Sequence, residues 1–354
     1  MKHPSKNRPT NQSPIIWLGQ SADTSSICSA YPDMRKLPFL TSLGCAIRKP
    51  SLHNTHFNDQ LRSKLGVTGP LMVDSGGFAL MLNSQARWDV RKVSRAINRI
   101  DADVFVSLDL PPRKGDSEAV RRHRIRTSAR NYDTLNQLFP SKQIMPVVHG
   151  RTLSEIDLSL QLIRRHSGKK LPWIGLGGIV PLLQHRSVSR QISKCGPEVF
   201  IARALRIIKD AFPEAKLHAF GAGGTRTFPA VFYFGADSAD SIGWRHAAGF
   251  GSIFLPLKSQ RVLAGPRANY AAPRKILDDS DLADIHCCKC PICLPKPRLA
   301  ERLAAFRKNF HNRSIHNAWT IANRGGPGFR DSLAAWLRWI LGSITPPVSP
   351  RLPA

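Results

Sequence analysis

Short apolar runs alternate with longer segments of helical pattern along most of the chain. The runs that have the length and composition of buried strands are Ile15–Leu18, Leu71–Val73, Val104–Leu108, Ile144–Val148, Trp173–Leu176, Leu217–Phe220 and, more weakly, Val231–Phe234. Helix-spaced apolar residues lie between them at Val90–Ile100, Glu118–Leu138, Thr152–Arg165 and Glu198–Ala211. This alternation predicts a parallel sheet in an α/β fold.

Polar or glycine residues come directly after successive runs. These residues are Asp74, Asp109, His149, Gly177-Gly178, Gly221, and Asp237 with Asp240. A TIM (β/α)8 barrel carries its catalytic groups at the C-terminal ends of many strands, whereas a doubly wound sheet gathers its ligands at one switch point. The repeated endings favour the barrel.

The two ends of the chain differ from the rest in composition. Residues 1–13 and about 343–354 are polar or rich in Pro and Ser, which predicts flexible ends around a single domain over 14–342. No apolar run approaches the roughly 20 residues of a membrane span. The first 13 residues lack the apolar centre of a secretory signal.

Charge adds the first indication of a partner. The 52 Lys and Arg residues outnumber the 24 Asp and Glu residues, so the formal net charge is +28. A field of this sign concentrates polyanions, and binding through it depends on salt. Basic residues recur along the whole chain, which favours nucleic acid as the partner over a merely basic protein.

The carboxylates after the strands are candidates for acid, base or nucleophile. Asp74 is followed by glycines, which let the backbone approach a ligand, although a tight turn explains the same pattern. Asp109 and one of Asp237 and Asp240 could equally be turn or capping residues. Displacing a base from a sugar requires one carboxylate at C1′ and one acid/base for the base itself, as in retaining glycosidases.

Four of the seven cysteines are crowded together near the C-terminus. Cys288, Cys290 and Cys293 form a C-x-C-x-x-C run, and His316 follows a predicted helix at 299–310. Three thiolates and one imidazole predict a closed, structural zinc site, with Cys287 and His311 as competing ligands and an iron–sulfur cluster or free thiols as alternatives. We expect this zinc-binding subdomain at about 284–320. The crowding fits a reducing, cytoplasmic compartment better than a disulfide framework.

These motifs together resemble the tRNA-guanine transglycosylases (queuine and archaeosine tRNA-ribosyltransferases), which replace guanine in nucleic acid with a 7-deazaguanine. The resemblance runs from about Val73 to Asn317. It rests on VDSGGF at 73–78, followed in the family's order by DLPP, VVHG, GLGGIVPLL, GADSADS and the cysteine run with a later His-Asn.

The resemblance implies a role for each matching residue. Asp240 would be the nucleophile that holds nucleic acid as a covalent glycosyl intermediate, and Asp74 the general acid/base. The implied base-binding residues are Ser75, Phe78, Asp109, His149 and Gly178, and the implied zinc ligands are Cys288, Cys290, Cys293 and His316. Nucleic acid (tRNA or DNA) and a 7-deazaguanine base would be the partners, and members of the family often form homodimers.

The chain departs from the family pattern at three positions. Ala79 and His149 stand where glutamines are usual, and the bulky Trp244 follows the nucleophile loop. These features resemble the paralogous branch that modifies DNA, known as DpdA, so the substrate polymer stays open. Two other functions remain as alternatives: a non-catalytic, zinc-bearing nucleic-acid-binding protein, and a barrel enzyme for small phosphorylated metabolites that uses GAGGTR at 221–226 as a phosphate cradle.

Overall fold

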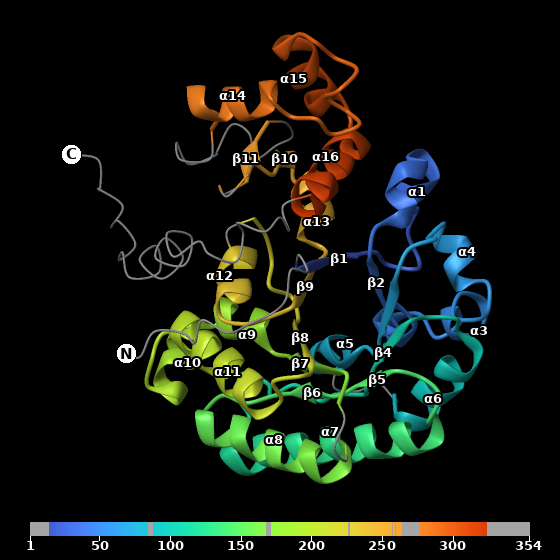
Figure 1. Cartoon of the computed structure of the whole chain (residues 1–354), viewed down its shortest axis with the longest axis vertical. Coiled ribbons are helices and arrows are strands. Elements are labelled where there is room, and N and C mark those ends of the chain that lie inside the picture. The colour runs from blue at the N-terminus through green and yellow to red at the C-terminus, as the bar shows by residue number, and fades with distance from the viewer. Residues whose placement is uncertain are drawn as a thin grey trace.

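The computed structural model describes residues 14–83, 88–167, 171–225, 227–256, 258, 260–263 and 276–323. It is an α/β fold in which a parallel sheet curls around a central axis and helices cover its outside (Figure 1). The expected flexible ends, 1–13 and 343–354, lie outside the described residues, so the domain limits stay a prediction.

Nine parallel strands form one nearly closed barrel. In chain order they are β1 (Ile15–Gly19), β2 (Phe39–Ser42), β3 (Leu71–Asp74), β4 (Val104–Val106), β5 (Ile144–Met145), β6 (Val147–Val148), β7 (Trp173–Leu176), β8 (Lys216–Ala219) and β9 (Ser238–Ser241). Their order in the sheet is β5-β4-β3-β2-β1-β9-β8-β7-β6.

The barrel closes through a single segment that is interrupted by a proline. Only Pro146 separates β5, which pairs with β4, from β6, which pairs with β7. Ser107 N–H donates to the carbonyl of Met145 on one side, and Gly175 N–H donates to the carbonyl of Pro146 on the other. Because proline has no N–H, the ladder of backbone hydrogen bonds is interrupted there. The strands β5 and β6 nevertheless occupy together one of the eight strand positions of the barrel. The predicted (β/α)8 barrel is confirmed.

The helices lie outside the barrel and beyond one of its ends. They are α1 (Ile27–Ala30), the 3-10 helix η1 (Pro32–Lys36), α2 (Gly44–Arg48), α3 (Leu52–Thr55), α4 (Leu61–Leu65), α5 (Gly77–Leu82), α6 (Val90–Arg99), α7 (Glu118–Leu138), α8 (Leu153–Ser167), α9 (Ile179–Gln184), α10 (Arg186–Ser193), α11 (Pro197–Ala211), α12 (Thr227–Tyr233), α13 (Gly243–Gly249), α14 (Asp279–His286), α15 (Leu299–Lys308) and α16 (Phe310–Ala322). None of the helices described has the length and apolarity to cross a membrane.

One predicted strand is wrong, and two strands of the barrel were not predicted; the short pair β10–β11 outside the barrel was not predicted either. Val231 and Phe232 belong to α12, a short helix that is buried on most sides and therefore carries a continuous apolar run like that of a buried strand. The strand in this part of the chain is β9, whose sequence SADS is polar. The other unpredicted strand is β2.

The alternation of side chains in the strands places polar groups at the mouth of the barrel. An apolar cluster that includes Leu40, Met72 and Val147 fills the barrel. Side chains two residues apart in a strand point to the same face. The next inward positions toward the C-terminal ends are therefore Ser42, Asp74 and His149, which lie above this core.

The C-terminal elements form a separate layer at one end of the molecule. Helices α14, α15 and α16 gather there beside the antiparallel pair β10 (Ser252–Ile253) and β11 (Arg261–Val262) (Figure 1). They have their own apolar cluster, which contains Cys290, Cys293 and Phe306. Helix α16 packs against α13, which begins three residues after Asp240 and so joins this layer to the barrel mouth.

Candidate active site

Asp74 is the last residue of β3 and lies at the mouth of the barrel. One of its carboxylate oxygens, Oδ2, accepts hydrogen bonds from the Ser42 hydroxyl at 2.5 Å and from Gly76 N–H at 3.1 Å. Burial, together with the negative charges of Asp109 and Asp240, raises the pKa of Asp74 to about 7 despite these two bonds. A carboxyl group with this pKa can give and take a proton near neutral pH, as a general acid/base must.

Asp240 lies in β9, on the same side of the strand as Ser238. Its Oδ1 accepts a hydrogen bond from Gly221 N–H at 2.7 Å and lies 3.2 Å from Nε2 of His218. The other ring nitrogen of His218 is 2.8 Å from the Ser238 hydroxyl, so the fully buried imidazole is held from both sides. Within the described part of the chain, these contacts fix Oδ1 of Asp240, and none is made by Oδ2.

Asp237, three residues earlier, has a different environment. Its Oδ2 accepts hydrogen bonds from Lys209 Nζ at 2.8 Å and from Leu217 N–H at 2.9 Å. These partners belong to α11 and the start of β8, away from the mouth. Of the two aspartates in GADSADS, only Asp240 is therefore placed beside the other carboxylates.

Asp109 and His149 form a buried pair at neighbouring positions of the barrel, Asp109 after β4 and His149 directly after β6. His149 Nε2 lies 2.7 Å from Asp109 Oδ2, and the imidazole is 1% exposed. The opposite ring nitrogen, Nδ1, is buried and has no hydrogen-bond partner among the described residues. When Asp109 is ionised and His149 is neutral, Nε2 carries the proton and Nδ1 is an acceptor that awaits a donor.

Glycines make room for this pair. A Cβ on Gly77 would lie 1.9 Å from Oδ1 of Asp109, and a Cβ on Gly177 would lie 2.3 Å from Cε1 of His149. Gly178 follows with a φ of 77°, a backbone conformation that favours glycine. The DSGG and GLGG segments therefore approach the Asp109–His149 pair with their backbones.

Ser75 and Phe78 differ in what they offer a ligand. The buried Ser75 hydroxyl donates to the carbonyl of Ser107 at 2.9 Å, which ties the end of β3 to the end of β4. Phe78, in the first turn of α5, is 43% exposed. An exposed aromatic ring at a barrel mouth offers a face on which a base can stack.

Ser42 and His218 touch the two aspartates but were not among the predicted site residues. Ser42 ends β2, a strand that was not predicted, and His218 lies inside the apolar run of β8. The available signal was a polar residue facing inward within a buried strand. Such a residue must find a polar partner.

The predicted metal ligands come together in the C-terminal layer. Ligand atoms of Cys288, Cys290, Cys293 and His316 all lie within 4.8 Å of one another. His316 Nδ1 faces the cluster, at 3.6 Å from Cys288 Sγ and 3.4 Å from Cys290 Sγ. Cys287 and His311 are exposed and lie outside the group, so they do not compete.

The surroundings of this group fit a structural metal ion such as zinc. The outer nitrogen of His316, Nε2, is 3.0 Å from the carbonyl of Phe254, which orients the ring and leaves Nδ1 for a metal. Hydrogen bonds from Cys290, Cys293 and His316 lower the pKa of the Cys288 thiol. Four protein ligands in a mostly buried site leave no open position for catalysis.

Comparisons with known proteins agree with this site. No protein-family model matches the chain. The chain is 25% identical over 196 residues to the tRNA-guanine(15) transglycosylase of Methanosarcina mazei. The aligned region covers 55% of this chain and 38% of that protein. It is 26% identical over 270 residues to the Pyrococcus abyssi protein of the same name, covering 73% and 39%, and 22% identical over 259 residues to that of Archaeoglobus fulgidus, covering 71% and 46%. The chain is therefore similar in sequence to several tRNA-guanine transglycosylases.

The chain spans less than half the length of these three transglycosylases. The similarity to the family was predicted from VDSGGF and the order of the later motifs, and it is confirmed. Within the transglycosylase-like barrel, the residues implied as nucleophile, acid/base and base reader stand together at one mouth.

Proposed function

We propose that the protein is a pentosyltransferase that exchanges guanine in a nucleic acid for a 7-deazaguanine base, through a covalent intermediate on Asp240. The observation that carries the proposal is the trio of carboxylates at the barrel mouth, where Asp109 and Asp240 both act on the titration of Asp74. The names of the relatives support the same class of reaction.

In the first half of the reaction, Asp240 attacks C1′ of the target nucleotide while the bond from C1′ to the base nitrogen breaks. Gly221 N–H and His218 hold Oδ1 of Asp240, which leaves Oδ2 to form the new bond. The electron pair of the broken bond goes to guanine, which takes a proton from neutral Asp74. A pKa of about 7 keeps Asp74 protonated in a substantial fraction of molecules at neutral pH.

The second half reverses these steps with the new base. Asp74, now ionised, accepts the proton from the ring nitrogen of the incoming base, and that nitrogen attacks C1′ and releases Asp240. Two displacements at the same carbon retain its configuration, as in retaining glycosidases.

The Asp109–His149 pair would read the polar edge of either base. The base offers N–H donors, which suit the carboxylate of Asp109 and the unpartnered Nδ1 of His149. The Gly177-Gly178 backbone borders the same space, and Phe78 provides a stacking face. A buried acceptor without a partner is costly, so a base that lacks a matching donor would be rejected.

Zinc, when bound, would supply a structural crosslink and no chemistry at C1′. Cys288, Cys290, Cys293 and His316 would hold it. The net charge of +28 would attract the polyanionic substrate, and association as a homodimer belongs to the proposal only through the resemblance.

Base exchange tests the proposal directly. The full chain is incubated with radiolabelled guanine and either a tRNA transcript or duplex DNA, and the label retained in polymer is counted. We expect incorporation by the wild type and by Asp210→Asn, a surface control on α11, and background incorporation by Asp240→Asn. A denaturing gel should show a covalent protein–nucleic-acid adduct for the wild type and Asp210→Asn, and none for Asp240→Asn.

Comparing tRNA with DNA in this assay identifies the substrate polymer and tests the non-catalytic alternative. Incorporation into tRNA alone or DNA alone identifies the substrate. Binding of both polymers without incorporation into either would instead favour a non-catalytic nucleic-acid-binding protein. Exchange by Asp240→Asn at the wild-type rate would remove Asp240 as nucleophile.

A further inference from the structure

A polar cavity lies beside the Asp109–His149 pair, between α5 and the loop that joins β4 to α7. Its volume is about 170 Å³, whereas a single water needs only about 10–15 Å³. Gly77 and Leu110, which flank Asp109, line it on one side, and Arg113, Arg124 and Trp88 line it elsewhere. We call this cavity the arginine pocket.

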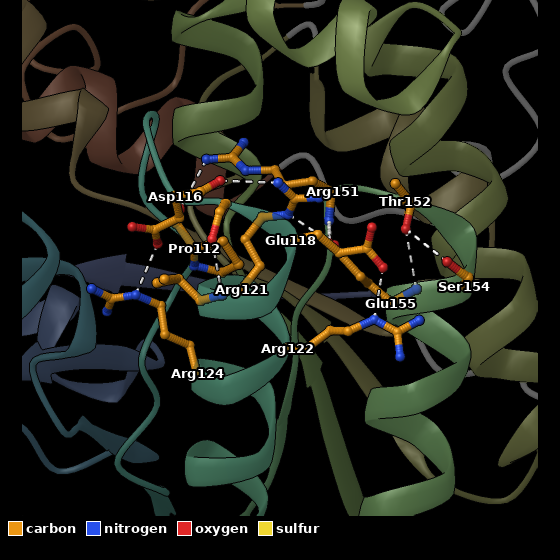
Figure 2. Close-up of polar contacts among 12 residues, drawn as sticks. Pro112, Asp116, Glu118, Arg121, Arg122, Arg124, Arg151, Thr152, Ser154 and Glu155 are labelled. Carbon is orange, nitrogen blue, oxygen red and sulfur yellow. Dashed lines mark hydrogen bonds and ion pairs between the residues drawn. The ribbon is translucent and has the colours of Figure 1, made fainter.

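The polar cluster behind the pocket carries more positive than negative charge (Figure 2). Arg121 pairs with Glu155 at 2.8 Å, and Arg124 pairs with Asp116 at 2.8 Å. Arg151 is only 6% exposed and donates to the carbonyl of Pro112 at 3.0 Å. Among the described residues it has no ion pair.

Burial and, after it, the positive charge of Arg121 lower the pKa of Arg151, although the charges of Glu155 and Asp116 oppose the shift. Arg121 and Arg124 thus each have an acidic partner, whereas Arg113 and Arg151 form no ion pair among the described residues. An anion would stabilise this partly buried surplus of positive charge.

Arg113 is positioned to provide a donor to that anion. Its Nη2 donates to the carbonyl of Leu80 at 3.0 Å, and its backbone N–H donates to Asp116 Oδ2 at 2.7 Å. Its Nε is buried and has no acceptor among the residues that the structure describes. The side chain is therefore fixed while one donor stays unused, and a phosphate oxygen is an acceptor that guanidinium groups bind well.

Trp88 gives the pocket a flat apolar wall. Its indole N–H donates to the carbonyl of Ser75 at 3.0 Å, and the Lys92 ammonium lies 6.0 Å from the ring centroid. The ring is thereby fixed to the loop that follows Asp74. Aromatic faces near basic groups are the usual contact surface for unpaired nucleotides.

We propose that the arginine pocket binds a nucleotide adjacent to the exchanged one, with its phosphate on Arg113 and Arg124 and its base against Trp88. This inference rests on the proposed function, since it assumes a nucleic acid at the barrel mouth. The bound phosphate neutralises the surplus charge, and the bound base fixes the strand beside the target nucleotide.

The salt dependence of binding tests this inference. The full chain is titrated into a fluorescein-labelled tRNA transcript and, separately, a labelled single-stranded DNA of equal length, at several salt concentrations. For Arg113→Gln we expect a dissociation constant about fivefold to tenfold higher, and a slope of log affinity against log salt that is shallower by about one phosphate contact. Arg113→Lys should restore the slope.

The matched control is Arg122→Gln, which removes an exposed arginine of α7 that pairs with Glu118. It should leave both quantities unchanged. Trp88→Leu should weaken binding without changing the slope, because it removes stacking and no charge. An unchanged slope for Arg113→Gln, or a loss of slope equal to that of Arg122→Gln, would overturn the proposal.

Kinetics distinguish a backbone phosphate from an anion carried by the free base. Arg113→Gln should raise the KM for nucleic acid and leave the KM for guanine unchanged; the reverse pattern would contradict the inference. Failure of base exchange by the wild type, with the salt effect intact, would remove the proposed reaction and leave the nucleotide site standing. Normal exchange without the salt effect would remove only the nucleotide site.

Discussion

Among single residues, Asp74 gives the clearest relation between environment and chemistry. Its carboxyl group is half-buried at the end of a strand and lies near two other carboxylates, so its pKa rises from 3.8 to about 7. The same shift that suits it to proton transfer makes its ionised form unfavourable in the folded protein.

The elevated pKa of Asp74 predicts how stability depends on pH. As the pH rises from about 4 to about 7, the unfolded chain releases this proton first, so the folded state loses stability over that interval. Asp74→Asn removes the loss. Relative to the wild type, we expect its unfolding temperature to rise between pH 4 and pH 8. The corresponding change in the free energy of unfolding is at most a few kcal/mol. Calorimetry at the two pH values measures this change.

Asp103 provides a control, because its pKa is shifted in the direction opposite to that of Asp74. Hydrogen bonds from Leu71 N–H and Arg62 outweigh the effect of burial and lower the pKa of Asp103. Its contribution to stability is therefore present at neutral pH and is lost as the pH falls through its folded pKa. Asp103→Asn should therefore lose stability relative to the wild type as the pH rises from below the folded pKa to about 4, with little further change up to pH 8. A pH-independent difference for Asp74→Asn would mean that Asp74 titrates normally.

At the scale of elements, strand β3, the glycines after it and helix α5 together position the carboxylates of Asp74 and Asp109. Gly76 has a φ of 93°, and this turn starts α5 directly behind Asp74. Gly77 then passes so close to Asp109 that a methyl group would overlap its carboxylate. The glycines of DSGG thus determine where two acidic side chains stand.

Gly77→Ala should therefore displace Asp109 and lower the rate of base exchange by about 10²-fold, because small displacements of catalytic groups have effects of that size. Gly115→Ala is the matched control, since no atom lies within 4 Å of its added Cβ. Initial rates and far-ultraviolet circular dichroism of both variants measure this effect. Equal rates for the two variants would show that Asp109 does not need its observed position.

The elements also show how far the sequence predicts the fold and the site. Strands with continuous apolar runs, such as β3 and β7, were predicted nearly to the residue because their periodicity is strong. The apolar run at Val231–Phe234 was mistaken for a strand, since a fully buried short helix has the same pattern. Strand β9 was missed because its inward positions hold Ser238 and Asp240, which serve the site. His218 was missed for the converse reason, as its neighbours are apolar.

In the molecule as a whole, the metal group and the barrel mouth are mechanically connected. His316 contacts the carbonyl of Phe254, and the next residue, Asn317, donates to the carbonyls of Trp244 and Ser252. Trp244 belongs to α13, the helix that follows Asp240 in the chain. The helix that follows β9 therefore packs on α16, which the metal would anchor.

Removal of zinc should lower both stability and base exchange. A structural zinc ion contributes directly to folding, so Cys290→Ser should lose bound metal and unfold at a temperature lower by roughly several degrees. Exchange activity should fall with it, because α13 loses its support. Metal content, unfolding temperature and initial rate, measured on the same preparations, are the three readouts.

Cys287→Ser is the matched control, because this exposed cysteine adjoins the ligands without belonging to their group. It should keep the metal, the unfolding temperature and the rate of the wild type. If Cys290→Ser lost its metal but exchanged bases normally, the coupling through α16 and α13 would be absent. The cysteine group would then stabilise the C-terminal layer alone, and the mouth of the barrel would owe its geometry to the strands.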